Sequence, residues 1–130
     1  MILQGTILLL CGVGLYASGF MTLKAARAAR GELRERSVVE TPRARSFGGA
    51  PNAALGLVYY GALALATLLF AVPAMWALAL GAALGAAAFS AYLAYSLLFV
   101  TRMPCVYCWT GHVVNWTLIV LVLLARPHAR

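Results

Sequence analysis

The sequence predicts an all-α integral membrane protein, built as an antiparallel bundle of four transmembrane helices. Of its 130 residues, 64% are hydrophobic, and the mean hydropathy is +0.90; a soluble domain of this size is expected to be about half apolar. The excess lies in four runs, each close to the roughly 20 residues that a helix needs to cross a bilayer. No run alternates with period two, so a β-barrel is not expected. We expect one domain over residues 1–130.

The four expected spans follow from where the apolar runs begin and end. The first run has no Lys or Arg before it and exceeds the roughly 7–15 apolar residues of a signal peptide, so we interpret it as a span. Pro51 and Asn52 signal the start of the second span, with Asn52 as the N-cap. Pro73 is expected to end that span. The expected spans are residues 2–23, 52–72, 75–100 and 105–125.

Residues 24–51 form the one long connection. Residues 24–30 are expected to continue the first helix until Gly31 permits a stop. A short surface helix over 32–40 and a turn-rich cover are expected to follow. In an antiparallel bundle this loop and the tight turn at 101–104 lie on the same side, so the loop is placed to cover the start of the last span.

The charge of the chain is concentrated in that loop. The net charge is +7, and seven of the ten Lys and Arg lie between residues 24 and 45 together with all three acids. A short loop between helices is a poor nucleic-acid site, so a topology signal or contact with anionic lipid head groups is the better interpretation. Eight of the ten cations fall on the side of the loop and the 101–104 turn, and the positive-inside rule places that side in the cytoplasm.

The last span opens on a C-x-x-C pair, Cys105 and Cys108, and His112 and Asn115 follow at helical intervals. On a helix these four residues share one stripe. The unpaired N–H groups and the dipole at a helix start favour a thiolate. Cys105 is expected to be the more exposed sulfur, which exchanges with an outside thiol. Cys108 lies about one turn deeper and is expected to face the interior of the bundle.

Polar and aromatic residues of the second and last spans predict a pocket at the level of the cysteines. A polar residue within a span is costly and usually marks a site or a partner contact. With Asn52 and His112 as hydrogen-bonding groups and aromatic side chains as apolar walls, such a pocket could hold a quinone ring, whose oxygens gain charge on reduction. The expected cofactor-binding residues are Asn52, Tyr59, Tyr60, Trp109, His112 and Asn115.

Other roles for the same residues stay open. Zinc needs about four ligands, whereas Cys105, Cys108 and His112 supply three, and His128 is expected at the opposite membrane face, so no metal is expected. His112 alone is also consistent with a histidine satisfied inside a bundle, and Asn115 with an interhelical hydrogen bond. The tyrosines of the second span are also consistent with simple packing.

Two motifs resemble those of the vitamin K epoxide reductase family, in its small prokaryotic four-helix form. Residues 46–60, SFGGAPNAALGLVYY, look like that family's approach to its second span, and residues 97–115, LLFVTRMPCVYCWTGHVVN, look like its C-x-x-C and following Asn. The resemblance implies a plasma-membrane thiol oxidoreductase coupled to a quinone of the ubiquinone or menaquinone class. It also implies that Cys105 and Cys108 form the active-site disulfide, with Cys108 next to the quinone and Asn52 in contact with it.

The loop departs from the family pattern. The family usually carries a second cysteine pair there, which shuttles electrons from a thioredoxin-like partner, whereas residues 24–51 contain no cysteine. The pattern VVET at 38–41 places Glu35 about where one of those cysteines would stand. The missing pair leaves three alternatives. A partner dithiol could attack the C-x-x-C pair directly, or a partner subunit could supply the shuttle thiols. In the third alternative, the protein has lost turnover and kept the quinone pocket.

Two questions therefore remain open at the level of sequence. One is the class of protein: an oxidoreductase, a non-catalytic accessory subunit of a larger membrane complex, or, with too few ligands in its favour, a thiol-based metal carrier. The other is orientation. The family usually faces its site outward, where disulfides persist, while the charge distribution favours the cytoplasm. Labelling of Cys105 in intact cells distinguishes the two orientations.

Overall fold

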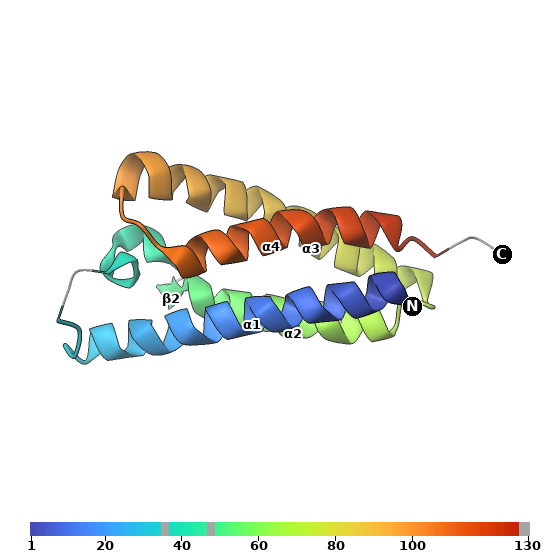
Figure 1. Cartoon of the computed structure of the whole chain (residues 1–130), viewed down its shortest axis with the longest axis horizontal. Coiled ribbons are helices and arrows are strands. Elements are labelled where there is room, and N and C mark those ends of the chain that lie inside the picture. The colour runs from blue at the N-terminus through green and yellow to red at the C-terminus, as the bar shows by residue number, and fades with distance from the viewer. Residues whose placement is uncertain (35–36, 47–48, 128–130) are drawn as a thin grey trace.

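Four helices account for most of the structure, a computed structural model that describes residues 1–34, 37–46 and 49–127. They lie side by side along one long axis (Figure 1). The prediction of an all-α apolar chain is confirmed. The helices are α1 (Ile2–Ala29), α2 (Asn52–Leu68), α3 (Pro73–Tyr95) and α4 (Val106–Leu124).

Three helical segments are long and apolar enough to cross a membrane. These are α1, α4 and the continuous stretch Pro73–Thr101, in which α3 runs on into the π-helical turn η3 (Ser96–Thr101). Helix α2 is also apolar but has 17 residues. The expected spans are thus found as helices, with the second one shorter than predicted.

The helices form a closed ring around one core. Helix α1 packs against α2 and α4, and α3 packs against the same two helices. The start of α1 and the end of α4 lie at one end of the molecule, and the loop after α1 lies at the other end, beside the turn that leads into α4 (Figure 1). The core contains the fully or almost fully buried side chains of Ile7, Cys11, Tyr60, Leu63, Leu118 and Val122.

Two predictions about helix ends were wrong. Pro51, not Asn52, is the N-cap of α2; the Asn52 side chain instead donates its Nδ2 to the carbonyl oxygen of Arg43, at 2.8 Å, and so is not used to cap its own helix. Pro73 does not end α2 but begins α3. A proline suits the first helical position because its missing N–H would have no partner there.

The start of the loop is largely as predicted. Helix α1 continues through the basic residues to Ala29, and Gly31 follows with φ +71°, a left-handed conformation that glycine adopts without strain. Among the described residues of 32–40, the expected surface helix is represented by one 3₁₀ turn at the end of the range. Val39 of that turn is buried against Met21 and Ala25 of α1.

The described residues of the rest of the loop form a second 3₁₀ turn and two short antiparallel strands, in which Arg45 pairs with Pro51. The second strand leads directly into α2. Glu35 lies outside the described residues. The loop elements are η1 (Val38–Glu40), η2 (Pro42–Ala44), β1 (Arg45–Ser46) and β2 (Ala50–Pro51).

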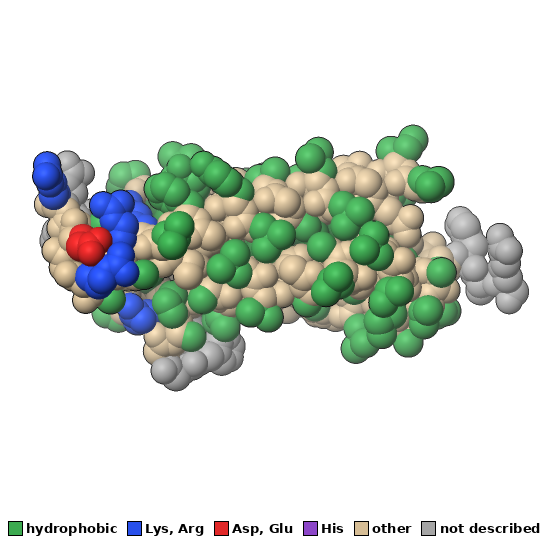
Figure 2. Space-filling view, turned by 90° about the horizontal axis from the view of Figure 1, so that it is seen from below, with side chains coloured by type: hydrophobic (Ala, Val, Ile, Leu, Met, Phe, Trp, Pro, Cys, Tyr) green, Lys and Arg blue, Asp and Glu red, His purple; other side chains and the backbone are tan. Residues whose placement is uncertain are grey.

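Charge and apolar surface are separated along the molecule. Figure 2 shows Lys and Arg gathered with acid at one end and hydrophobic side chains over the rest of that face. Glu32 pairs with Arg30 at 2.8 Å and with Arg27 at 3.7 Å, both on the exposed surface, where such pairs contribute little to stability. Large apolar side chains such as Leu65 and Leu78 are about two-thirds exposed. Many exposed large apolar side chains along a helical bundle are typical of contact with lipid.

Candidate functional site

The C-x-x-C pair stands at the start of α4, and its cysteines are free thiols in the structure. Cys105 is the N-cap, with extended backbone, and its Sγ accepts a hydrogen bond from the backbone N–H of Cys108 at 3.3 Å. Cys108 lies in the first turn of the helix. Both side chains are half-buried and pack against the cluster of Met21, Ala25 and Val39. Helix α1 and the loop therefore cover the pair, as the topology predicted.

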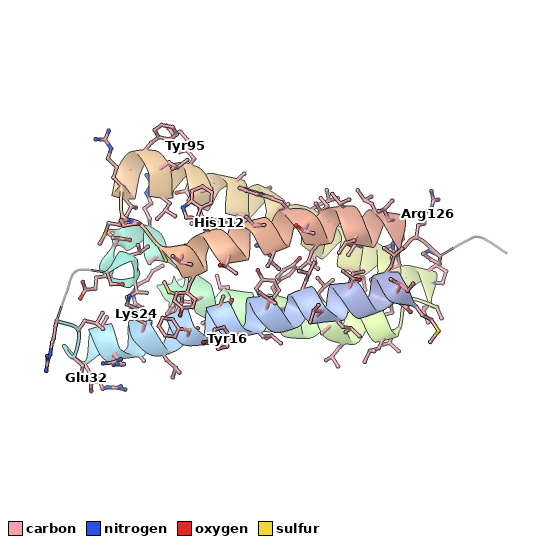
Figure 3. The ribbon with its side chains drawn as sticks, viewed as in Figure 1. Tyr16, Lys24, Glu32, Tyr95, His112 and Arg126 are labelled. Atoms are coloured by element: carbon pink, nitrogen blue, oxygen red, sulfur yellow. The ribbon has the colours of Figure 1, made fainter. Side chains whose placement is uncertain are left out.

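The surroundings of Cys105 favour its thiolate. Its pKa is lowered to about 6, chiefly because the thiol of Cys108 donates a hydrogen bond to its sulfur. The backbone N–H groups of Cys108 and Tyr107 and the positive charge of Lys24 lower the pKa further, while burial opposes them. Lys24 lies near the loop end of α1 (Figure 3). Because the thiolate is the nucleophile in disulfide exchange, Cys105 is suited to react with an outside sulfur near neutral pH.

This pKa predicts a specific pH dependence of alkylation. In the reduced protein, the rate of Cys105 carbamidomethylation should rise as the pH is raised through about 6 and level off above it, since the thiolate fraction is then complete. Mass spectrometry of the Cys105 peptide after timed exposure to iodoacetamide measures it. In Cys108→Ala, which lacks the thiol donor, the midpoint should move upward. A wild-type midpoint near the ordinary thiol value of about 8.5 would contradict the description of the site.

A cavity of about 540 Å³ is lined by residues of all four helices and the loop. This volume lies within the roughly 300–1,000 Å³ that small-molecule sites occupy. Its wall is mostly apolar, with a few polar groups. Cys108 is part of the wall and Cys105 is not. Only the deeper sulfur of the pair therefore adjoins the cavity.

Most of the residues predicted to bind a cofactor share this cavity wall. Trp109 is not among them; its ring meets His112 edge-on, with ring centroids 5.8 Å apart. His112 is itself buried, at 6% exposure, and its ring also stacks on Trp116. Figure 3 shows His112 on α4, at the same end of the bundle as the loop. The predicted residues on the wall are Asn52, Tyr59, Tyr60, His112 and Asn115.

Two polar atoms on the cavity wall are buried without a hydrogen bond to any described residue. They are Asn52 Oδ1 and the hydroxyl oxygen of Tyr59, atoms of two residues that line the cavity. A buried polar atom without a partner costs about 1–3 kcal/mol, and such atoms are rare enough in folded proteins to need an explanation. A ligand that brings its own polar atoms to the cavity would satisfy both.

The deeper part of the wall is held by a chain of interhelical hydrogen bonds. The hydroxyl of Tyr60 donates to Asn115 Oδ1 at 2.6 Å, and Asn115 Nδ2 donates to Ser90 Oγ at 2.6 Å. Asn115 thus joins α2, α3 and α4, the packing role that was one of its two interpretations. These hydrogen bonds hold the side chains of Tyr60 and Asn115 in place at the cavity.

Residues 6–123 match the family model described as "Vitamin K epoxide reductase family". The match spans nearly the whole chain and includes both motifs on which the resemblance was based. The chain belongs to the vitamin K epoxide reductase family. No curated protein matches it. Membership, together with three helices apolar enough to span a bilayer, indicates an integral membrane protein. The family suggests a membrane thiol–disulfide oxidoreductase and is in general linked to quinones.

For a chain of the vitamin K epoxide reductase family, the loop is distinctive in its chemistry. It contains no cysteine in the sequence, and it contributes to the cavity through Arg43 and the 3₁₀ turns. The guanidinium of Arg43 donates to the hydroxyl of Tyr92 and, at 3.2 Å, to Ser96 Oγ, and its carbonyl accepts from Asn52. The loop is therefore hydrogen-bonded to the start of α2 and to the C-terminal end of α3 with the following turn η3.

Sequence reasoning missed several residues of this wall. Ser90 and Ser96 are polar residues within an expected span, which is the signal that could have singled them out. Both are almost fully buried. Tyr107 also lines the cavity and stacks on Phe20 of α1, with ring centroids 4.1 Å apart. Nothing in the local sequence around Arg43 distinguishes it from the other loop cations.

A metal site finds no support in the described part of the chain. Within it, no three His, Cys, Asp or Glu side chains group closely enough to hold an ion. His128, the most distant candidate ligand, lies outside the described residues. The expectation of no metal stays a prediction.

Proposed function

We propose that this chain is a quinone-linked thiol:disulfide oxidoreductase of a prokaryotic plasma membrane, in which the C-x-x-C pair passes electrons between a partner dithiol and a quinone. The observation that carries the proposal is the division of the pair. Cys108 adjoins a cavity with unsatisfied polar atoms, while Cys105 stands at the helix N-cap outside it. One sulfur is thus placed for an outside thiol and the other for an inside ligand.

We also propose that all four helices cross the membrane as an antiparallel set. Helix α2, at 17 residues, is about 26 Å long at 1.5 Å per residue, and the apolar residues 69–72 extend it toward the roughly 30 Å of a hydrocarbon core. The start of α1 and the end of α4 lie at the same end of the bundle, which supports the same topology. The charged loop and the C-x-x-C pair then lie together at one membrane surface.

The cysteine pair would act through two exchanges. A partner thiolate attacks Sγ of Cys105 in the oxidised pair, which breaks the Cys105–Cys108 bond and forms a mixed disulfide. The partner's second thiol displaces Cys105, so the partner leaves oxidised and the pair holds two electrons and two protons. The two electrons and two protons then leave through Cys108 to the quinone, and the disulfide between Cys105 and Cys108 re-forms. Cys105 can then react with another partner thiolate.

The volume and the few polar groups of the cavity support a quinone ring of the ubiquinone or menaquinone class as its ligand, which when bound would accept two electrons and two protons. Tyr59 would hydrogen-bond one ring oxygen, and Asn52 Oδ1 would accept from the other ring oxygen when the ring carries hydroxyl groups, so that both orphaned atoms gain a partner. His112 and Tyr60 would border the ring from α4 and α2. Asn115 would hold Tyr60 in place, and Trp109 would support His112 from behind.

A turnover assay tests the proposal. The purified protein, in lipid nanodiscs, is mixed with a reduced thioredoxin-like protein and either a ubiquinone or a menaquinone analogue. We expect one quinol formed for each partner disulfide formed. If neither quinone is reduced and the chain co-purifies with a stoichiometric membrane partner, the proposal is overturned in favour of an accessory subunit.

A further inference from the structure

The amide of Asn52 has a fixed orientation in the cavity wall. The carbonyl oxygen of Arg43 can only accept a hydrogen bond, so the side-chain nitrogen of Asn52, at 2.8 Å, must face it. The oxygen Oδ1 is then the amide atom left for a ligand, and it is buried with no partner among the described residues. An amide oxygen accepts and cannot donate. This position therefore requires a ligand that brings an O–H or N–H group.

Arg43 is what holds that orientation. Its guanidinium is bonded to the hydroxyl of Tyr92 and to Ser96 Oγ, and it lies over the Tyr92 ring at 5.5 Å from the centroid. These contacts anchor the loop to α3, so the Arg43 carbonyl stays opposite Asn52. Among the residues that the structure describes, Arg43 is also the only Lys or Arg on the cavity wall.

The other orphaned group, Tyr59, does not discriminate in the same way. A phenol hydroxyl can both donate and accept, so it satisfies a carbonyl oxygen or a hydroxyl group equally. The two groups therefore differ in the ligand atoms that they can bind. The Tyr59 hydroxyl can hydrogen-bond any ring oxygen, whereas Asn52 Oδ1 can hydrogen-bond only a ring oxygen that carries a proton.

We infer that the cavity prefers the reduced, hydroxyl-bearing form of its ring ligand over the oxidised form, and that Arg43 is the positioning residue that imposes this preference through Asn52. The inference rests on the proposed function and names the redox form that the site favours. A quinone carbonyl beside Asn52 Oδ1 would leave that acceptor unsatisfied, whereas a quinol hydroxyl would donate to it. We therefore expect roughly tenfold tighter binding of the quinol.

This preference would set the direction of electron flow. Tighter binding of the reduced form raises the reduction potential of the bound couple, by about 30 mV for each tenfold preference in a two-electron reaction. The bound ligand is then a better oxidant of the cysteine pair than the same ligand free in the membrane. The site would favour oxidation of the partner dithiol.

The test is a comparison of two dissociation constants. A short-chain ubiquinone and its quinol are titrated anaerobically into the full chain carrying Cys105→Ala and Cys108→Ala, so that no electrons are exchanged, and binding is followed by tryptophan fluorescence. In this background the quinol should bind about tenfold more tightly. Asn52→Ala should bring the ratio close to one. Arg43→Ala should lower it severalfold, and Arg43→Lys, which keeps a donor at this position, should restore part of it.

Arg45→Ala is the matched control, since the Arg45 guanidinium donates to the carbonyl of Gly49 in the same loop and is not part of the cavity wall. Its ratio should equal that of the background. Tyr92→Phe removes one hydrogen bond of Arg43 without changing the sequence of the loop, and it should also lower the ratio of quinol to quinone affinity. If Arg43→Ala and Tyr92→Phe keep the full ratio, the inference is wrong and the quinone site stands. If neither form of the ligand binds, the proposed function falls as well.

Discussion

Gly14→Ala should destabilise the protein by about 1–3 kcal/mol, the usual cost of forcing an extra methyl group into a packed core. A Cβ at Gly14 would lie 2.5 Å from Cζ of Tyr60, closer than carbon atoms approach. The ring cannot simply retreat. Its hydroxyl donates to Asn115 Oδ1 at 2.6 Å and lies 3.3 Å from the carbonyl oxygen of Gly111. The methyl group must therefore separate α1 from α2 or break the Tyr60–Asn115 bond.

Gly12→Ala provides the control on the same helix. A Cβ at Gly12 would meet nothing within 4 Å, and alanine is favoured over glycine in a helix by about 1 kcal/mol. Thermal unfolding in one detergent should therefore place Gly14→Ala below wild type and Gly12→Ala at or above it. Equal melting temperatures for the two variants would show that Tyr60 does not pack against α1 as described.

The helices were predictable because their apolar runs are long and uninterrupted, but their ends were not. Pro73 can follow a helix or begin one, and the sequence around it is equally apolar on both sides. Asn52 has a side chain that is favoured at N-caps, yet its amide nitrogen donates to the carbonyl oxygen of Arg43, nine residues earlier. In both cases the deciding partner comes from the tertiary structure and leaves no local pattern.

The candidate site divides in the same way. The spacing of Cys108, His112 and Asn115 predicted that they share a face, and the cavity adjoins all three. Trp109 was predicted to form an apolar wall of the pocket, but a residue one position after Cys108 is turned by about 100° on a helix, and Trp109 lies off the wall. Arg43 and Ser90 reach the site through contacts with residues far away in the sequence, which periodicity cannot anticipate.

Cys108→Ala should reduce quinone-dependent oxidation of a partner dithiol by at least about 10³-fold, because removing the group that carries the covalent chemistry leaves only the background reaction. Cys105 is outside the cavity wall, so it cannot replace Cys108 at the ligand. The Cys105 thiol would still attack an outside disulfide, but no second sulfur would complete the exchange. Cys11→Ala is the matched control. Cys11 lies on α1 and is fully buried in the core of the bundle. Its loss should leave turnover within about twofold of wild type, since it takes part in no thiol exchange.

The measurement that tests the role of the pair most directly is a single turnover without a partner protein. The chain is reduced, freed of excess reductant and mixed anaerobically with a quinone, and both quinol and remaining free thiols are counted. Wild type and Cys11→Ala should form one quinol for each Cys105–Cys108 disulfide that appears, and Cys108→Ala should form none. Stoichiometric quinol formation by Cys108→Ala, or none by wild type, would contradict electron transfer through this pair.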